Sequence, residues 1–244
     1  MRLVIHQAYF LPWLGYLSKL AFTDTFIVLD NVNFSKRHFF DRTKIVNMHG
    51  EIQWIGLPVG ENYKVKCKDV EVKDKDFVEK ILKNIMYSYA KADYYKKEWN
   101  DLEEALKEPL YNYTNLVDIN IKIIKNILNI LDIKLPDIYY SSQFEQTDDP
   151  TLRLISMCKK LKGDSLLIGA GKSTKVHNWG KFKDLGIKIY IQDYLSDHPV
   201  YKQIRRQRLS FEKGLSIIDA ILNVGREKTK EFICDKQFEP KQIS

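Results

Sequence analysis

The segment HQAYFLPWLGY, near the start of the chain, combines a proton-transfer group with several aromatic rings. His6 and Gln7 begin it at the end of an apolar run, and an imidazole that titrates near neutral pH can serve as a general base. Gly15 lets a backbone or a ligand come close at the start of the next element. The rings between them predict a flat wall for a sugar or base: Tyr9, Phe10, Trp13 and Tyr16. The alternative is that these rings are core and that His6 bonds a local carbonyl.

Polar side chains that could join this segment follow a second apolar run, TFIVLD. Asp30 and Asn31 leave the end of that run, and the carboxyl ends of parallel strands lie at one edge of a sheet. In the next stretch, NFSKRHFFDRTKI, Lys36 and Arg42 can hold phosphate or carboxylate groups, Arg with a rigid two-pronged set of donors. The alternative for this stretch is a solvated basic loop.

A glycine-containing turn, in LLIGAGKST, follows a third apolar run. Gly169 opens it and Lys172 follows, and the backbone amides of such a turn can cradle a phosphate. The spacing of a P-loop fails, because position 166 is Leu rather than Gly. A simple turn before a helix is the competing interpretation.

The stretch IQDYLSDHPVYKQ adds polar groups after a fourth run. Gln192 lies at the strand end, while His198, Tyr201 and Gln203 follow in a predicted loop. His198 is a second candidate for a catalytic acid or base, and a structural histidine that caps the loop is the alternative. Together the four stretches predict one cavity, in which the two histidines and Gln7 act in catalysis and the other named residues bind substrate.

The elements that must position these groups begin with an α/β pattern. Strands at 2–6 and 25–30 flank a helix at 14–22, an order typical of two parallel strands. A hairpin with strands near 43–47 and 51–57, and a strand near 68–72, follow. Three amphipathic helices come next and predict a helical insertion or cap at about 75–132; they lie at 76–92, at about 92–106, ending before Pro109, and at about 113–131.

The last third of the chain returns to strands and helices. Strands are predicted at IYYSSQF, SLLIGAG and KIYIQDY, with a helix at 149–161 that begins with a good Asp N-cap and a Pro. A final helix, LSIIDAILNVG, ends at Gly225, and the tail after Phe238 is predicted to be loose. The chain, 1–244, is thus interpreted as one α/β domain with a mixed, mostly parallel sheet, flanking helices and a helical insertion.

Composition limits the classes of function. The net charge of +7 favours anionic ligands such as phosphates, but the charges form no basic stripe of the kind that indicates nucleic-acid binding. The three cysteines are far apart and match no zinc pattern, so we expect reduced thiols in a cytoplasmic protein and no metal site. No apolar run approaches the ~18 residues that cross a bilayer, so we expect no membrane insertion.

These stretches together resemble the WbqC-like protein family, found among bacterial O-antigen, lipopolysaccharide and other surface-glycan biosynthesis proteins. The similar features are HQAYFLPWLGY, NVNFSK, Arg42 and QWIGLPV, then TLRL, IQDY with HPVYKQ, and LSIIDAILNVG. They cover residues 1 to about 225. Ala8 stands where the family commonly has Pro, which makes the loop less rigid here, and IGAGKST also departs from the family pattern.

The resemblance implies a transferase of surface-glycan biosynthesis that adds an aminoacyl group, such as glycyl, or an acyl group to an amino sugar, including a nucleotide-linked one. The donor stays open, and no cofactor is evident. One alternative is an ATP-dependent nucleotidyltransferase or ligase, which would use ATP with magnesium at the first loop and at Lys172. Another is a non-catalytic module that binds nucleic acid or a glycan-assembly partner. It ranks last, because the polar groups gather at strand ends rather than along a basic face.

Overall fold

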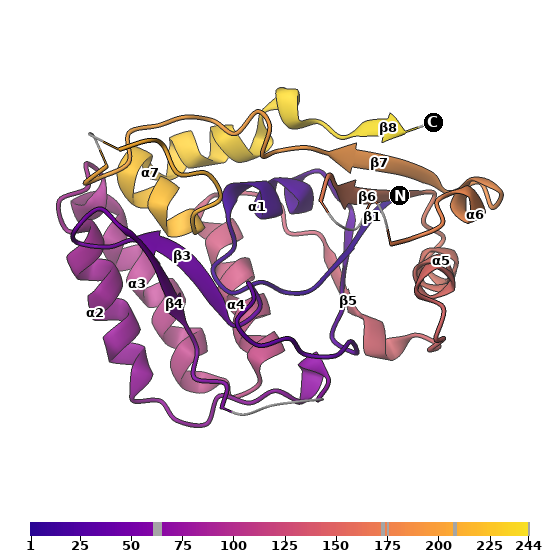
Figure 1. The fold of residues 1–244 in the computed structure, drawn as a ribbon, viewed down its shortest axis with the longest axis horizontal. Coiled ribbons are helices and arrows are strands. Elements are labelled where there is room, and N and C mark those ends of the chain that lie inside the picture. The colour runs from indigo at the N-terminus through magenta and orange to yellow at the C-terminus, as the bar shows by residue number, and fades with distance from the viewer. Residues whose placement is uncertain (61–64, 172–173, 175, 207–208, 244) are drawn as a thin grey trace.

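The computed structural model describes residues 1–60, 65–171, 174, 176–206 and 209–243, and it is built around a six-stranded sheet (Figure 1). From one edge to the other its strands are β5 (Asp137–Tyr140), β2 (Thr25–Val28), β1 (Arg2–His6), β6 (Ser165–Gly169), β7 (Lys188–Gln192) and β8 (Lys241–Ile243). The first five run parallel, and β8 is antiparallel to β7. The predicted mixed, mostly parallel α/β sheet is therefore confirmed.

The order of the strands reverses once. In chain order, β1, β2 and β5 extend the sheet in one direction, whereas β6 and β7 extend it in the other. The neighbours β1 and β6 therefore mark a topological switch point. In open α/β sheets, ligands bind beyond the carboxyl ends of the strands at such a point, because the connections leave it toward opposite faces.

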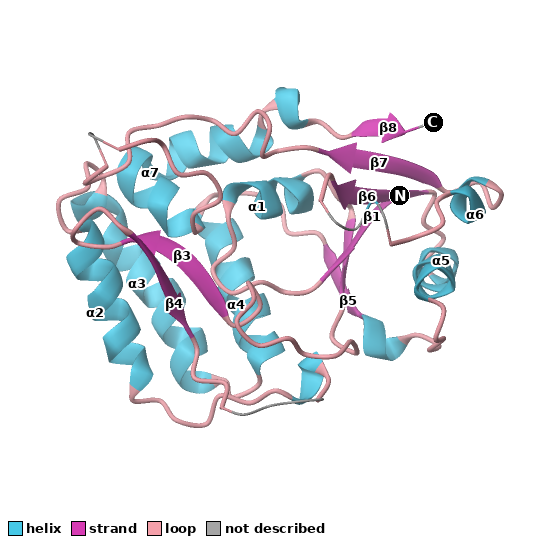
Figure 2. Ribbon diagram, in the orientation of Figure 1, coloured by secondary structure: helices cyan, strands magenta, loops and turns pink. Residues whose placement is uncertain are grey.

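Helices cover both faces of the sheet (Figure 2). Leu3 and Val4 show the two faces, because successive side chains of a strand point to opposite sides. Leu3 packs with α5 and α6, while Val4 packs in a separate core with α1 and α7. The bounds of these helices are α1 Leu14–Ala21, α5 Pro150–Lys160, α6 Gly180–Lys183 and α7 Ile217–Cys234.

Three further helices and a two-stranded antiparallel sheet complete the fold beside α1 and α7 (Figure 1). Their bounds are α2 Phe77–Tyr89, α3 Tyr95–Asn112, α4 Leu116–Ile130, β3 Arg42–Val46 and β4 Ile52–Gly56, and the short 3-10 helices are η1 Cys67–Asp69, η2 Ser141–Gln143 and η4 Lys236–Phe238. The predicted β3–β4 hairpin is confirmed: Asn47 Oδ1 accepts the backbone N–H groups of His49 and Glu51 in its turn. No described helix has both the length and the hydropathy needed to span a bilayer.

The helix predicted to end before Pro109 instead continues through it to Asn112. Proline has no N–H for the carbonyl four residues earlier, which here belongs to Ala105. Asn126 on α4 supplies the missing donor, with its Nδ2 2.9 Å from the Ala105 oxygen. A side chain from the next helix thus permits a helix that local sequence rules would end.

The helix that begins at Ile217 is interrupted at Gly225, as predicted, but a second helical segment follows directly. Gly225 has a non-helical φ of +80°, and helical turns resume beyond this kink and continue to Cys234. A β-carbon at Gly225 would stand 2.5 Å from the Tyr94 ring, so glycine is required by both the backbone conformation and the close approach of Tyr94, the residue before α3. Thr229 Oγ1 donates to the Gly225 carbonyl at 2.7 Å and so satisfies an acceptor at the kink.

Two further segments differ from prediction. The segment 68–72 forms η1 and an isolated bridge from Glu71 to Asn115 rather than a strand, because its start is held by the loop after β2: Lys68 donates its backbone N–H to the Asp30 carbonyl at 2.8 Å. The tail after Phe238 is not loose but forms β8, because the free edge of β7 offers unpaired backbone groups.

Candidate functional site

A crevice opens between β1 and β6 at their carboxyl ends. The pairing of the two strands ends at Val4 and Leu167. However, β1 stays paired with β2 as far as His6, and β6 stays paired with β7 as far as Gly169. The sheet therefore divides at its switch point. A cavity of about 830 Å³ lies here, a volume typical of pockets that bind small molecules.

This cavity brings together predicted site residues from three distant stretches of the chain. Those that line it are His6, Gln7, Tyr9, Trp13, Gly15, Tyr16, Gly169 and Gln192. They come from β1 and the loop after it, from α1, and from the ends of β6 and β7. The position of these residues is a finding, while their roles in binding or catalysis stay predictions.

His6 is held in one orientation by a backbone contact and two rings. Its Nδ1 lies 3.0 Å from the Gln7 carbonyl oxygen, and it meets Tyr9 and Tyr16 in T-shaped arrangements. A carbonyl only accepts, so we assign the proton to Nδ1, which leaves a lone pair on Nε2. Burial, with the nearby charge of Lys19, lowers the pKa of His6 to about 3. The imidazole is therefore neutral at pH 7, with Nε2 as an acceptor.

Aromatic rings form one wall of the cavity. Tyr9 stacks on Tyr16 with ring centres 5.2 Å apart, and Phe39 tilts against the Tyr9 ring at 5.5 Å. The Tyr16 hydroxyl donates to the Gln7 carbonyl at 2.8 Å, which locks the ring pair onto the end of β1. The wall is thus flat and fixed, as a site for a planar base or a sugar face requires.

A second wall surrounds the start of α1. A β-carbon at Gly15 would overlap the Trp13 ring and stand 2.8 Å from the Tyr194 β-carbon. Glycine therefore lets Trp13 fold back across the first turn of the helix, where it meets Tyr194 edge to face at 5.7 Å. Both rings line the cavity, and the groups that approach Gly15 closely are these side chains, whereas the prediction named a backbone or a ligand.

Cationic side chains are the feature of this cavity that sequence reasoning missed. Among the described residues that line it, the Lys and Arg side chains are Lys19, Lys44, Arg153 and Lys213. Lys44 has a carboxylate partner, Glu212, at 3.8 Å. Asp193 is the one described carboxylate of the lining, and it accepts from the Ser196 hydroxyl at 2.6 Å. The cavity therefore carries excess positive charge and suits an anionic ligand.

The layer of α5 and α6 contributes a further imidazole. His177 and Trp179 line the cavity with ring centres 5.2 Å apart. Burial lowers the pKa of His177, so its ring is neutral near pH 7. Within the described part of the chain, the buried Nδ1 of His177 has no hydrogen-bond partner, which leaves it able to bind a ligand group.

Several predicted residues lie outside this cavity. Phe10 is fully buried in the core. Asp30, also buried, accepts from the Ser141 and Ser142 hydroxyls at 2.8 and 2.6 Å, so it closes the end of β2 rather than lining the crevice. The neighbouring Asn31 donates its backbone N–H to the same Ser141 hydroxyl.

The basic residues predicted as anion ligands also lie elsewhere. Lys36 donates to the Gly60 carbonyl at 2.7 Å on the surface. The Arg42 guanidinium lies over the Trp54 ring, 4.1 Å from its centre. Neither residue lines the cavity. Lys172 lies outside the described residues.

The loop after β7 packs against the cavity wall without lining the cavity at His198, Tyr201 or Gln203. His198 is buried and stacks on Trp13 with ring centres 6.3 Å apart, while its Nδ1 donates to the Pro199 carbonyl at 2.9 Å. Tyr201 and Gln203 both donate to the buried carboxylate of Asp219, at 2.8 and 3.2 Å. Tyr201 and Gln203 thus pack against α7, while His198 packs behind Trp13, and none of the three lines the cavity.

Local patterns could have pointed to two of the missed cations. Lys19 follows Tyr16 by three residues and Gly15 by four, so it lies on the same face of α1 as these predicted site residues. Arg153 is the arginine of TLRL, a stretch selected only for its family resemblance. Nothing local distinguishes Lys213, which reaches the cavity from a loop.

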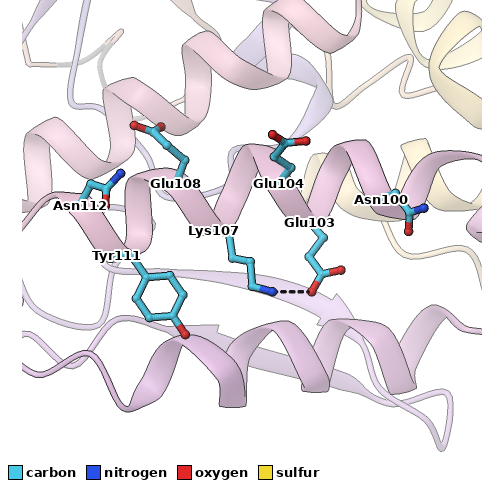
Figure 3. A pocket seen from close by; sticks show the side chains of 7 residues that line it. All are labelled: Asn100, Glu103, Glu104, Lys107, Glu108, Tyr111 and Asn112. Carbon is cyan, nitrogen blue, oxygen red and sulfur yellow. Dashed lines mark hydrogen bonds and ion pairs between the residues drawn. The ribbon is translucent and has the colours of Figure 1, made fainter.

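A second hollow, of about 450 Å³, lies along the exposed side of α3 (Figure 3). Its lining residues are Asn100, Glu103, Glu104, Lys107, Glu108, Tyr111 and Asn112. Lys107, the cation of this lining, lies 3.3 Å from Glu103, and the Tyr111 hydroxyl donates to Glu79. Because the hollow is remote from the strand ends and its cation is paired, we assign no site to it. Among the described residues, no group of three His, Cys, Asp or Glu could hold a metal ion.

The fold and the site define an α/β protein with a cationic, aromatic-walled cavity at the switch point of its sheet. The chain belongs to the WbqC-like protein family, which matches residues 7–231. It is also similar to "Uncharacterized protein Rv1507c" of Mycobacterium tuberculosis, with 27% identity over 228 residues, 93% of this chain and 95% of the relative. No solved structure matches the chain.

Proposed function

We propose that this WbqC-like protein is a transferase of surface-glycan biosynthesis that adds an aminoacyl or acyl group to the amino group of a sugar. The observation that carries the proposal is a neutral, oriented His6 beside stacked aromatic rings in one cavity. Flat rings suit a sugar face, and a neutral imidazole can accept a proton. The resemblance to surface-glycan biosynthesis proteins supplies the biological setting.

In the proposed step, the sugar amine attacks the carbonyl carbon of an activated acyl donor. A C–N bond forms, and the bond from that carbon to the leaving group breaks. His6 Nε2 accepts the proton that the nitrogen loses and returns it to the leaving group. A weak base is adequate here, because the nitrogen becomes strongly acidic as the new bond gives it positive charge.

Gln7 is the proposed donor to the oxyanion that forms on the attacked carbonyl. Its Nε2 contacts the Cys67 sulfur at 3.4 Å, and a thiol is a weak acceptor that a developing negative charge can displace. Burial raises the pKa of Cys67 to about 11, so this thiol stays protonated and is not the nucleophile.

The test incubates a nucleotide-linked amino sugar with a carrier-bound thioester, a charged tRNA, or ATP with an amino acid, and measures the mass of the sugar. We expect a gain of one acyl or aminoacyl group with one of these donors. His6→Ala should slow the gain by about 100-fold or more, while His49→Ala, an exposed imidazole on the β3–β4 turn, should not. No mass gain with any donor would contradict the transfer, and a fully active His6→Ala protein would remove His6 from it.

A second candidate, an ATP-dependent nucleotidyltransferase or ligase, is favoured by one observation. The reversal of strand order between β1 and β6 is the usual place of nucleotide phosphates in doubly wound sheets. Fold alone names no reaction, so this candidate needs its own test. Calorimetry with ATP and magnesium decides it: magnesium-dependent binding would support it, and no binding would exclude it.

A further inference from the structure

Lys19 lines the crevice with an ammonium group that has no counter-ion among the residues the structure describes. Its Nζ lies 3.7 Å from the point that a β-carbon on Gly169 would occupy, and 5.7 Å from the centre of the Tyr16 ring. Within the described ranges, no hydrogen bond or ion pair involves this Nζ. Partial burial of an unpaired cation is unfavourable, and a ligand that brings negative charge removes that penalty.

Arg153 reaches the same cavity from α5, in the opposite layer. Its Nε and Nη2 both donate to the Thr147 carbonyl, at 3.0 and 2.7 Å. A carbonyl holds the guanidinium in place without neutralising it, and the N–H groups that remain can bind an anion. The group is therefore both oriented and charged before any ligand arrives.

Lys213, which lines the cavity from a loop, is likewise a cation held by backbone carbonyls. Its Nζ donates to the Leu195 carbonyl at 2.8 Å and lies 3.3 Å from the Ser196 carbonyl. Three cations thus face one cavity with no carboxylate partner among the described residues, and the nearby Asp193 is engaged with Ser196. This excess suits an anion with more than one charge rather than a single carboxylate.

We propose that Lys19 and Arg153 bind the diphosphate group of a nucleotide-bearing substrate across the crevice between β1 and β6. Cations from opposite layers can each take one phosphate, and the stacked Tyr9–Tyr16 pair lies beside them for a base or a sugar ring. This inference rests on the proposed function in one respect, because both place the substrate in the same cavity. It adds the class of substrate, a nucleoside diphosphate derivative.

Isothermal titration calorimetry of the full chain with inorganic pyrophosphate tests the site without any transfer chemistry. We expect wild-type binding that Lys19→Met weakens by about tenfold or more, because a charge-assisted contact is lost. Lys83→Met, an exposed lysine on α2, is the control that should bind as wild type. Arg153→Met should weaken binding similarly. Arg153 also holds the Thr147 carbonyl, whereas the Lys19 Nζ makes no hydrogen bond or ion pair in the described structure. The result for Lys19 therefore decides.

Two further ligands distinguish which kind of nucleotide the site binds. A uridine diphosphate sugar and ATP are each titrated in the absence and in the presence of pyrophosphate, and pyrophosphate should weaken the binding of both. The ligand with the higher affinity identifies the substrate class, a nucleotide sugar or a nucleoside triphosphate. Equal pyrophosphate binding by wild type and Lys19→Met, no pyrophosphate binding at all, or ligands that pyrophosphate does not displace would each overturn the proposal. If Lys19-dependent binding is found while every donor fails to modify the sugar, the diphosphate site stands and the transferase function fails.

Discussion

Lys19 on α1 and Gly169 on β6 are complementary: the lysine Nζ lies 3.7 Å from the point where a β-carbon of residue 169 would stand. Because residue 169 has no side chain, open space remains between the end of β6 and this ammonium. The two residues bring the first helix close to the end of β6 at the switch point, where β1 and β6 diverge.

Gly169→Ala tests this relationship. The new methyl group would make an ordinary van der Waals contact with a flexible lysine end, so the free energy of unfolding should change by only about 0.5 kcal/mol. It would, however, crowd the ammonium on its ligand side, and pyrophosphate binding measured by calorimetry should weaken severalfold. A folded variant with unchanged affinity would show that the space over Gly169 is not used by the anion.

The affinity for anions should depend on pH through Lys19. Burial lowers the pKa of this lysine to about 8, so its ammonium is charged at pH 7 and largely neutral at pH 9. The groups that face it, His6 on β1 and Tyr16 on α1, are neutral throughout this range, because burial lowers the pKa of the first and raises that of the second. Pyrophosphate binding by the wild type should therefore weaken from pH 7 to pH 9.

The control for this pH dependence is Lys19→Arg, whose guanidinium stays charged. Its affinity should hold steady or rise over the same range, since pyrophosphate itself becomes more negative. Parallel pH curves for the wild type and Lys19→Arg would contradict the assignment of the titration to Lys19.

Asn126 should stabilise the fold because it replaces the donor that Pro109 lacks. Asn126→Ala leaves the Ala105 carbonyl without its side-chain partner and should lower the free energy of unfolding by about 1–2 kcal/mol, measured by urea unfolding. In a Pro109→Ala background the residue 109 N–H can bond that carbonyl, so the same change should cost clearly less. Equal costs in both backgrounds would show that the two residues are not coupled.

Asp219 should make stability depend on pH. This carboxylate is fully buried and accepts from the Tyr89 and Tyr201 hydroxyls, and burial raises its pKa from 3.8 to about 6. Between these values the folded state keeps a proton that the unfolded state has lost. This group's contribution to the free energy of unfolding is therefore present below about pH 4 and falls as pH rises to about 6, by at most ~3 kcal/mol.

Asp219→Asn removes that titration and provides the measurement. The wild type minus variant difference in unfolding free energy should decrease as urea unfolding is repeated from pH 4 to pH 6.5, and then level off. A difference that stays constant over this range would refute the raised pKa. The variant itself should be less stable at low pH, because its amide N–H₂ faces hydroxyl and amide donors.

Much of the architecture follows from local patterns that the sequence displays. Apolar runs separated by helical periodicity predict the parallel strands, and Asp149 caps α5 as expected, accepting from the Thr151 and Leu152 N–H groups. The incorrect predictions have non-local causes. Asn126 bonds the carbonyl that Pro109 leaves unpaired, so the helix continues, and the tail after Phe238 pairs with the edge of β7 as β8. No window of sequence contains both partners of such contacts.

The sequence by itself determined that polar residues would stand at strand ends and that His6, Gln7, Tyr9 and Tyr16 would lie close together, because these residues share one short segment. The tertiary structure alone decided which strand ends open to a ligand. The end of β2 is closed by serines that bind Asp30, whereas β1 and β6 part and admit Lys19 and Arg153 from opposite layers. The physical reason is that a cavity forms where the order of strands reverses, and that order is set by packing between segments far apart in the chain.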